Sequence, residues 1–363
     1  MWPSNELTEL LGVRWPILQA PMAGGPGSPE LAAAVSEAGG LGSLGLGYLS
    51  AQAGRAAIGA VRARTDQPFA ANLFVPSGAG DGEGEGAVAA ARSRDLIRPF
   101  LRELGLGDDA ATSSPGEPFE AQVAVLVEER VPLVSFTFGA PPPDVVGALH
   151  EVGTLVMGTA TTVAEALVLE TAGCDIVCAQ GGEAGGHHGA FVHDPRIDAV
   201  GTVALVPAVA DTVGLPVVAA GGVMDGRGIV AALALGARAV QMGTAFLRCP
   251  EAGTNPAYRA ALAAAAESDT VRTSAFSGRT ARGVLNRYVE VLGRHPDVAR
   301  YPVMNALTRE LRAAAVAAGS ADLQSLWAGQ GVALGRDLPA AQLVRVLVEE
   351  VAEVLDRLHA SGT

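Results

Sequence analysis

Eight short apolar runs, separated by alanine-rich segments of helical period, make up most of the first 250 residues. Most of the intervening segments end at or beside a glycine, as helices commonly do. Eight successive βα units predict an α/β fold of the (β/α)8 TIM barrel type. A doubly wound open sheet is the competing fold, but the sequence after the first run, QAPMAGGPG, lacks the G-x-G-x-x-G loop of that fold. The runs begin at Pro16, Leu41, Phe69, Leu133, Thr154, Asp175, Pro216 and Ala239.

Two segments depart from this alternation. Residues 76–117 begin with the glycine-rich, acidic stretch PSGAGDGEGEG and continue as a helical segment to about Leu106. Residues 251–363 form a tail with helical segments at 257–268 and 340–358. We expect residues 1–75 and 118–250 to form the barrel, and 76–117 to pack with 251–363 as a mostly helical lid over its C-terminal mouth.

Charge and composition exclude several classes of function. The net charge of −13 and the lack of a basic cluster argue against partners such as nucleic acid or an anionic membrane, and favour small molecules. The chain contains no lysine, which excludes a Schiff-base lysine and a Walker A loop. The absence of a signal peptide and of long apolar stretches predicts a soluble, cytoplasmic protein. Oligomeric state is left open, with a homodimer as one option.

The three cysteines, Cys174, Cys178 and Cys249, are too few and too irregularly spaced for a disulfide framework or a zinc site. We expect them to be buried, reduced thiols. We predict no metal site in this chain.

Glycine-rich sequences follow three of the predicted strands, where the active site of a TIM barrel lies. After strand one, Pro21 to Gly25 could accept a flat ligand against the backbone, or form an ordinary βα turn. After strand seven, Gly221 and Gly222 precede a helix for which Asp225 is the expected N-cap. After strand eight, Gly243 and Thr244 could donate to the same anion. Loops seven and eight are the usual phosphate site of this fold, so a mononucleotide such as FMN would suit them.

Two adjacent histidines, His187 and His188, follow strand six in the glycine-rich stretch AQGGEAGGHHGAF. A structural histidine normally lies on a regular, packed element, so this setting favours a functional imidazole. Only one of the two rings is expected to face the ligand, as a catalytic base. A metal site is less well supported, since Glu183 and the histidines lack ligand spacing and a second shell. We interpret the remaining histidines as surface or packing residues: His150, His193, His295 and His359.

Taken together, these motifs make the chain similar to the nitronate monooxygenase (2-nitropropane dioxygenase) family of FMN-dependent TIM-barrel enzymes. The resemblance rests on PILQAPMAGG, ANLFV, VSFTFGAPPP, CAQGGEAGGHHG, PVVAAGG, AVQMGTAF and SGRTARGVLNRY, in the family order, and on LWAGQG in the tail. It implies that His187 is the catalytic base, with His188 at a variable position. It also implies that FMN is bound by Asn72, Gln180, Gly185, Gly222, Gln241, Met242, Gly243 and Thr244, with Met22 and Ala23 behind the ring and Pro21 and Gly221 beside them.

The implied reaction is the oxidation of an alkyl nitronate by dioxygen to a carbonyl compound and nitrite, without a nicotinamide. His187 would remove the proton α to the nitro group of a neutral nitroalkane. Some members of the family place a lysine and several tyrosines around the substrate, whereas this chain offers Tyr288 and Tyr301 in that region.

Two other functions stay open. Related flavin barrels with the same loop reduce enoyl thioesters or quinones with NAD(P)H, so an FMN- and NAD(P)H-dependent reductase is the alternative enzyme. A barrel that binds a phosphorylated ligand without turnover is the third reading.

Overall fold

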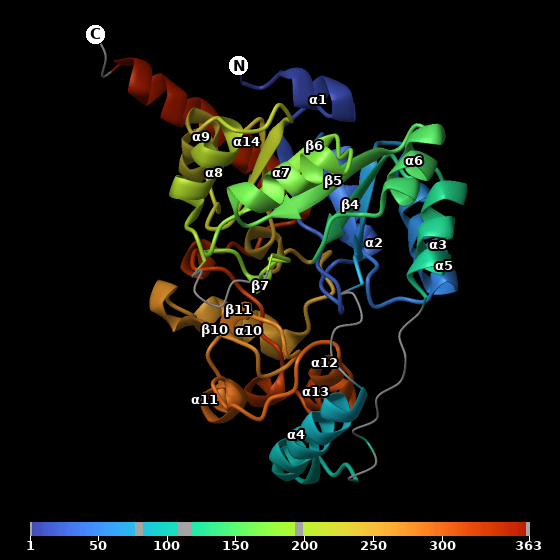
Figure 1. Ribbon diagram of the computed structural model, residues 1–363. Coiled ribbons are helices and arrows are strands. Elements are labelled where there is room, and N and C mark those ends of the chain that lie inside the picture. Colours follow the sequence, from blue (N-terminus) through green and yellow to red (C-terminus); the bar gives the residue numbers. More distant parts are fainter. Residues whose placement is uncertain (1, 77–82, 108–109, 111–117, 193–198, 361–363) are drawn as a thin grey trace.

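The centre of the computed structural model, which describes residues 2–76, 83–107, 110, 118–192 and 199–360, is a sheet of eight parallel strands. The strand order is β1-β9-β8-β6-β5-β4-β3-β2. A bridge between Leu18 and Leu41 brings the two outermost strands together and closes the barrel (Figure 1). The predicted TIM barrel is therefore confirmed. The strands are β1 (Ile17–Gln19), β2 (Gly42–Gly45), β3 (Phe69–Phe74), β4 (Leu133–Thr137), β5 (Leu155–Ala160), β6 (Ile176–Gln180), β8 (Val217–Ala220) and β9 (Ala239–Met242).

Helices follow the strands and cover the outside of the barrel. Several of them begin at side-chain caps, because Ser28, Ser50, Thr162 and Asp225 each accept a backbone N–H of the first turn. Asp225 is thus confirmed as an N-cap. These helices are α2 (Pro29–Glu37), α3 (Ala51–Arg62), α5 (Phe119–Glu128), α6 (Pro143–Glu151), α7 (Val163–Thr171), α8 (Thr202–Ala210) and α9 (Gly226–Ala234).

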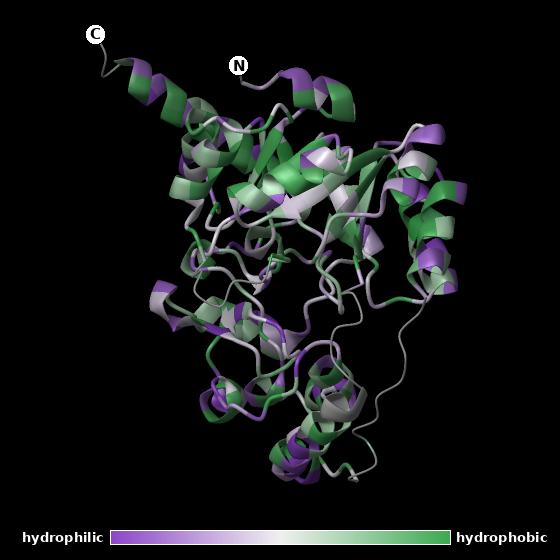
Figure 2. Cartoon of the chain, in the orientation of Figure 1, coloured by the Kyte–Doolittle hydropathy of each residue, from purple (hydrophilic) through white to green (hydrophobic). Residues whose placement is uncertain are grey.

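Apolar side chains fill both faces of the barrel sheet. Inside, Leu133, Met157 and Ile176 pack with Leu7 and Leu11 of α1 (Glu6–Leu11), which closes the N-terminal end of the barrel. A second layer lies between the strands and the surrounding helices. Figure 2 shows the apolar strands enclosed by helices of mixed hydropathy. The three cysteines are buried and free of disulfides, as expected, and burial raises the pKa of each thiol to about 12.

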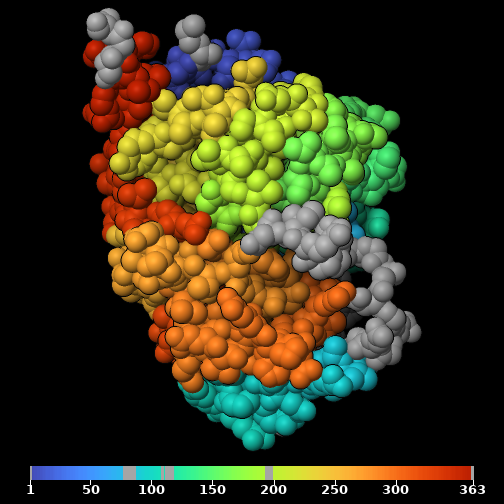
Figure 3. Space-filling model, turned by 60° about the vertical axis from the view of Figure 1, so that its left-hand side comes forward, coloured from blue at the N-terminus to red at the C-terminus, as the bar shows by residue number. Residues whose placement is uncertain are grey.

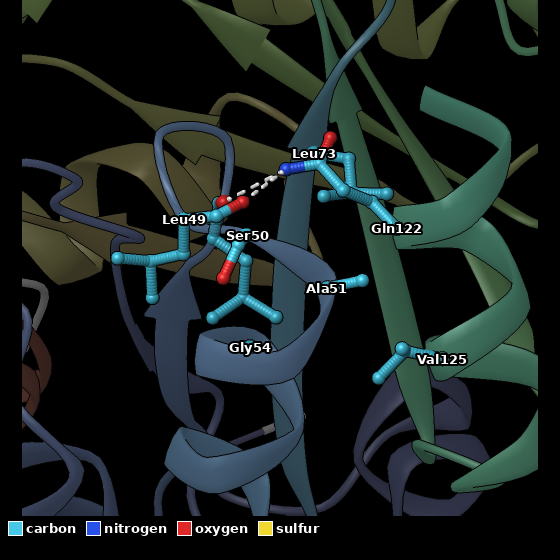
Figure 4. A pocket seen from close by; sticks show the side chains of 8 residues that line it. Leu49, Ser50, Ala51, Gly54, Leu73, Gln122 and Val125 are labelled. Carbon is cyan, nitrogen blue, oxygen red and sulfur yellow. Dashed lines mark hydrogen bonds between the residues drawn. The ribbon is translucent and has the colours of Figure 1, made fainter. Parts of the chain in front are cut away.

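One small pocket in the barrel wall is partly open to the surface. It lies among β3, α3 and α5, has a volume of about 10 Å³, and has room for one water at most. Gln122 borders it and donates from Nε2 to the carbonyl oxygens of Leu46 (3.3 Å) and Leu49 (2.7 Å), as Figure 4 shows. Because these bonds hold the chain that follows β2, this side chain has a structural role.

The lid combines the insertion and the tail at the C-terminal end of the barrel strands (Figures 1 and 3). Phe100 and Leu101 of the insertion pack with Phe276, Tyr288 and Leu307 of the tail in one apolar cluster. We expected a mostly helical lid, but the tail also contributes two antiparallel strands, β10 (Thr270–Thr273) and β11 (Ala281–Val284). The lid helices are α4 (Glu83–Glu103), α10 (Pro256–Ala264), α11 (Arg287–Leu292), α12 (Val303–Leu307) and α13 (Arg309–Ala317).

The C-terminal helix α14 (Ala340–Ala360) packs on the barrel, although we expected it in the lid. It contacts α2 and α9, and Leu343, Leu347 and Val351 enter the layer between the strands and the helices. The physical reason is that a TIM barrel needs a helix to cover its last and first strands, β9 and β1. The chain forms the lid after β9 and then returns to supply that helix.

No helix in the described ranges combines the length and the hydropathy needed to cross a bilayer. His150 pairs with Asp175 at the surface (2.9 Å), and His359 is exposed on α14. The Nδ1 of His295 accepts a backbone N–H from Asp297 (3.3 Å). These three residues are surface or packing histidines as expected, whereas His193 and residues 77–82 of the predicted linker lie outside the described residues.

Candidate active site

The glycine-rich loop after β6 is held by the lid. Gly186 and His187 form a two-residue strand, β7, that pairs antiparallel with β11, with His187 opposite Ala281. Gln180 ties the loop to the end of β6, since its Nε2 donates to His187 O (3.1 Å) and its Oε1 accepts from Gly189 N (2.7 Å). This glycine-rich loop is therefore held from both sides.

The imidazole of His187 lies where this loop, the lid and the barrel mouth meet. Its Nε2 is 2.8 Å from the hydroxyl oxygen of Ser277. The ring packs edge-on against Phe138 (centroids 5.7 Å apart) and at a tilt against Trp327 (5.5 Å). Burial lowers the pKa of His187 to about 3, with further lowering by Arg279 and Arg312. The ring is thus neutral at physiological pH and has a lone pair to accept a proton.

Aromatic side chains at the ends of β2, β3 and β4 line this region. Phe138, just after β4, contacts Phe74 (4.7 Å) and Tyr301 (5.8 Å), and Phe74 contacts Tyr48 (5.2 Å). Phe138 has a φ of 78°, a left-handed conformation that is costly for a non-glycine residue and often occurs at functional sites. Burial raises the pKa of Tyr48, so its hydroxyl stays protonated.

The loops after β8 and β9 lie beside a returning segment of the tail. Gly221 and Gly222 have φ values of 114° and 73°, which side chains rarely adopt. Thr244, after β9, accepts the backbone N–H of Gly329 at its hydroxyl oxygen (2.9 Å). A Cβ at Gly185 would lie 2.5 Å from that same tail backbone, so the loop after β6 also touches the tail there. The structure brings together the three loops that the sequence assigned to the phosphate and the base.

The segment after β1 borders the barrel mouth next to the end of β2. A Cβ at Gly45 would lie 2.5 Å from Ala23 N, so glycine allows this close approach between the ends of β1 and β2. Met22, which follows Pro21, packs between the barrel layer and the cluster that joins it to the lid. The side chain of Met242 is buried in the barrel layer, so only its backbone could contact a ligand.

Asn72 and Gln241 lie on the strands as expected. Asn72 Nδ2 donates to Ser135 O and Oγ (both 3.0 Å) and to Thr137 Oγ1 (3.2 Å). Among the described residues no donor meets Asn72 Oδ1, which stays available to a ligand N–H. Gln241 makes one long contact from Nε2 to Cys178 Sγ (3.5 Å). Of the two tyrosines predicted near the substrate, Tyr301 contacts the aromatic residues of the mouth, whereas Tyr288 is buried in the lid core.

Sequence reasoning missed six residues of this region: Tyr48, Phe138, Ser277, Arg279, Arg312 and Trp327. Phe138 and Tyr48 follow strands, so applying the strand-end rule to all eight strands would have found them. Ser277 and Arg279 lie in the SGRTARG motif, which was noted without a role for either. Within the described part of the chain, no group of three or more metal-ligating side chains comes together.

A closed (β/α)8 barrel with a neutral, partnered histidine at its C-terminal mouth defines a class of barrel enzymes that act on small molecules. Residues 4–350 match the family model for nitronate monooxygenase. The chain is 47% identical over 357 residues to a nitronate monooxygenase of Pseudomonas aeruginosa, covering 96% of this chain and 99% of that protein. This chain belongs to the nitronate monooxygenase family of flavin-dependent oxidoreductases.

Two solved structures are similar over nearly the whole chain. A nitroalkane oxidase from Streptomyces ansochromogenes has a TM-score of 0.90 and 41% identity, covering 98% of this chain and all of that one. FabK from Thermotoga maritima has a TM-score of 0.75 and 33% identity, covering 99% of both chains. Both share the fold, and the first is the nearer of these two in shape and sequence.

Proposed function

We propose that this enzyme binds FMN and oxidises alkyl nitronates with dioxygen to a carbonyl compound and nitrite. The observation that carries the proposal is the neutral imidazole of His187, packed between Phe138 and Trp327 with its Nε2 2.8 Å from Ser277. The similarity to a nitronate monooxygenase and to a nitroalkane oxidase supports the same chemistry.

The residues at the mouth suit a flavin mononucleotide. Gly221 and Gly222 follow β8, Gly243 and Thr244 follow β9, and these four would hold the phosphate with backbone N–H groups and the threonine hydroxyl. Asn72 Oδ1 would accept from the ring, and Gln180, Gly185 and Gln241 would border it. Pro21, Met22, Ala23 and the backbone of Met242 would support its other side. When bound, FMN supplies single-electron transfer between the substrate and dioxygen.

The chain's own residues bind the substrate and move its proton. Ser277 holds the imidazole of His187 in one orientation, and Phe138 and Trp327 exclude water from it. With a neutral nitroalkane, His187 would take the proton from the carbon beside the nitro group. With a nitronate that proton is already gone, so the imidazole would only help to position the anion.

His187→Asn tests the role of the base, with His188→Asn as the matched control. We expect nitrite release from a neutral nitroalkane to fall by about 10²- to 10⁴-fold in the first variant, because the general base is lost. Release from the preformed nitronate should fall by about tenfold or less. Equal losses for both substrates would contradict the role of His187 as base.

The similarity to FabK favours one second candidate, an FMN- and NAD(P)H-dependent reductase of enoyl thioesters or quinones. Anaerobic visible spectra of the FMN-loaded protein separate the two functions. Bleaching by propionate 3-nitronate, followed by nitrite release in air, is the expected result. Bleaching by NADH or NADPH alone would move the assignment to the reductase.

A further inference from the structure

Two arginines of the lid, Arg279 and Arg312, place positive charge beside His187. Both lower the pKa of its imidazole. Arg312 donates to Thr308 O, and the Thr308 hydroxyl donates to the carbonyl of Phe276, whose ring packs against Trp327 beside the imidazole. The Cζ of Arg279 lies 3.9 Å from the ring centroid of Phe138, which itself packs on the imidazole. Both arginine side chains are half-buried, and this partial burial lowers the pKa of both guanidiniums.

Neither guanidinium has a carboxylate partner among the described residues. Arg279 donates from Nη2 to Ala190 O, and its Nε and Nη1 meet no described acceptor. Arg312 donates from Nη2 to O and Oδ1 of Asn305 (both 3.0 Å) and from Nε to Thr308 O (3.3 Å). All of these acceptors are uncharged, and Arg309 adds a further positive charge near Arg312.

Among the described residues, Glu165 is the one carboxylate that raises the pKa of Arg279, and its oxygens already accept hydrogen bonds from other residues. It is buried and accepts from Thr161 N and Oγ1 at one oxygen, and from Phe191 N and Val192 N at the other, all at 2.7–2.9 Å. Desolvated cations without a counter-ion are costly, and proteins retain them where a ligand supplies the opposite charge.

The described contacts of these arginines do not include the glycines expected to hold the phosphate. Both guanidiniums lower the pKa of Tyr48, which follows β2, and of His187. Arg279 also packs on Phe138, which follows β4. The glycines expected to hold a phosphate follow β8 and β9. In the closed barrel, β1 lies between β9 and β2. An anion beside the imidazole would supply the ion-pair partner that the described residues do not.

We propose that Arg279 and Arg312 bind the negatively charged group of the substrate, the planar nitronate, next to His187. This inference rests on the function proposed above and assigns the residues that recognise its substrate. Two guanidinium groups favour an ionised nitronate over a neutral nitroalkane, because hydrogen bonds between two opposite charges are stronger than those to a neutral nitro group. The aromatic residues Phe74, Phe138 and Tyr301 would contact its alkyl part.

Arg279→Met and Arg312→Met test the proposal in the FMN-loaded protein, with the exposed lid residue Arg294→Met as the matched control. The probe is sodium nitrate, a planar monoanion, and the readout is the change in the flavin visible spectrum on titration. We expect each of the two variants to weaken nitrate binding by about tenfold or more, and the control to bind as the wild type does. Lysine at either position should recover part of the affinity, because it restores the charge.

Steady-state kinetics with an alkyl nitronate provide the second measurement. The methionine variants should raise KM for the nitronate about tenfold or more while kcat changes much less. The reason is that the lost interaction stabilises the bound substrate as much as the transition state. Unchanged nitrate affinity and unchanged KM in folded, FMN-loaded Arg279→Met and Arg312→Met would overturn the inference and leave the proposed function standing. Arginine-dependent nitrate binding without any nitronate turnover would instead overturn the function.

Discussion

At the residue scale, the environment of His187 keeps its imidazole neutral at pH values well below its usual pKa. Burial and two nearby guanidiniums disfavour the imidazolium, so the neutral ring persists to a pH of about 3. In solution the same side chain would be protonated below about pH 6.5. The protein thus keeps the base available under acidic conditions, at some cost in stability there.

This shift predicts how stability depends on pH. The pKa of His187 is lower in the folded than in the unfolded protein, so the unfolded chain binds one more proton between about pH 3 and 6.5. The contribution of this group is therefore fully present above pH 6.5 and is lost as the pH falls toward 3. Urea unfolding from pH 7 to 4 should show a smaller decline in His187→Gln than in the wild type. An identical decline in both would contradict the shift.

At the element scale, strand β7 depends on a close approach that only glycine permits. A Cβ at Gly185 would lie 2.5 Å from Ala328 C and Gly329 N, so Gly185→Ala must push the loop after β6 away from the tail. We expect the variant to retain less FMN after purification, as measured by the ratio of flavin to protein absorbance. Gly147→Ala in α6 is the control, because its Cβ would meet no atom within 4 Å. Full flavin content in Gly185→Ala would refute this role.

Helix α14 provides a second prediction at this scale. Leu347 is fully buried in the layer between the helices and the strands, so Leu347→Ala leaves a cavity there. We expect a loss of about 2–5 kcal/mol in the free energy of unfolding. Leu358→Ala on the same helix should be nearly neutral, since this side chain is 58% exposed. If the two variants were equally stable, α14 would not be part of the barrel core.

At the scale of the whole molecule, the lid depends on contacts between segments about two hundred residues apart. The hydroxyl of Ser93, fully buried on α4, donates to Asp297 O (2.8 Å) and accepts from Ala299 N (2.8 Å). Figure 3 shows α4 at the end of the lid farthest from the barrel, against the tail. This one side chain joins the insertion to the tail.

Ser93→Val should therefore loosen the insertion while the barrel stays intact. The buried N–H of Ala299 and the partly buried carbonyl of Asp297 lose their partner, which costs about 1–3 kcal/mol. Amide hydrogen exchange should rise in α4 and around Asp297 and stay unchanged in β4 and β5. Val88→Ala, at an exposed position of α4, is the control. A uniform rise over the whole chain would show that lid and barrel unfold together.

The sequence by itself determined the barrel, its strands and the loops that carry the proposed site. Each strand is a local apolar run, and each helix begins and ends at local signals such as Ser28, Asp225 and Gly236, so periodicity and caps suffice to locate them. The strand ends of a barrel meet at one mouth, which is why His187 could be placed near Gly221 and Gly243.

Only the tertiary structure decided what surrounds His187. Ser277, Arg279 and Arg312 are distant from it in sequence, and their contacts depend on the β7–β11 pairing and on lid packing. The assignment of α14 to the barrel also depended on the tertiary structure. An apolar stripe on a helix predicts that one face is buried, but it does not identify the element that covers this face. Local patterns specify elements, whereas desolvation and charge depend on which distant segments come together.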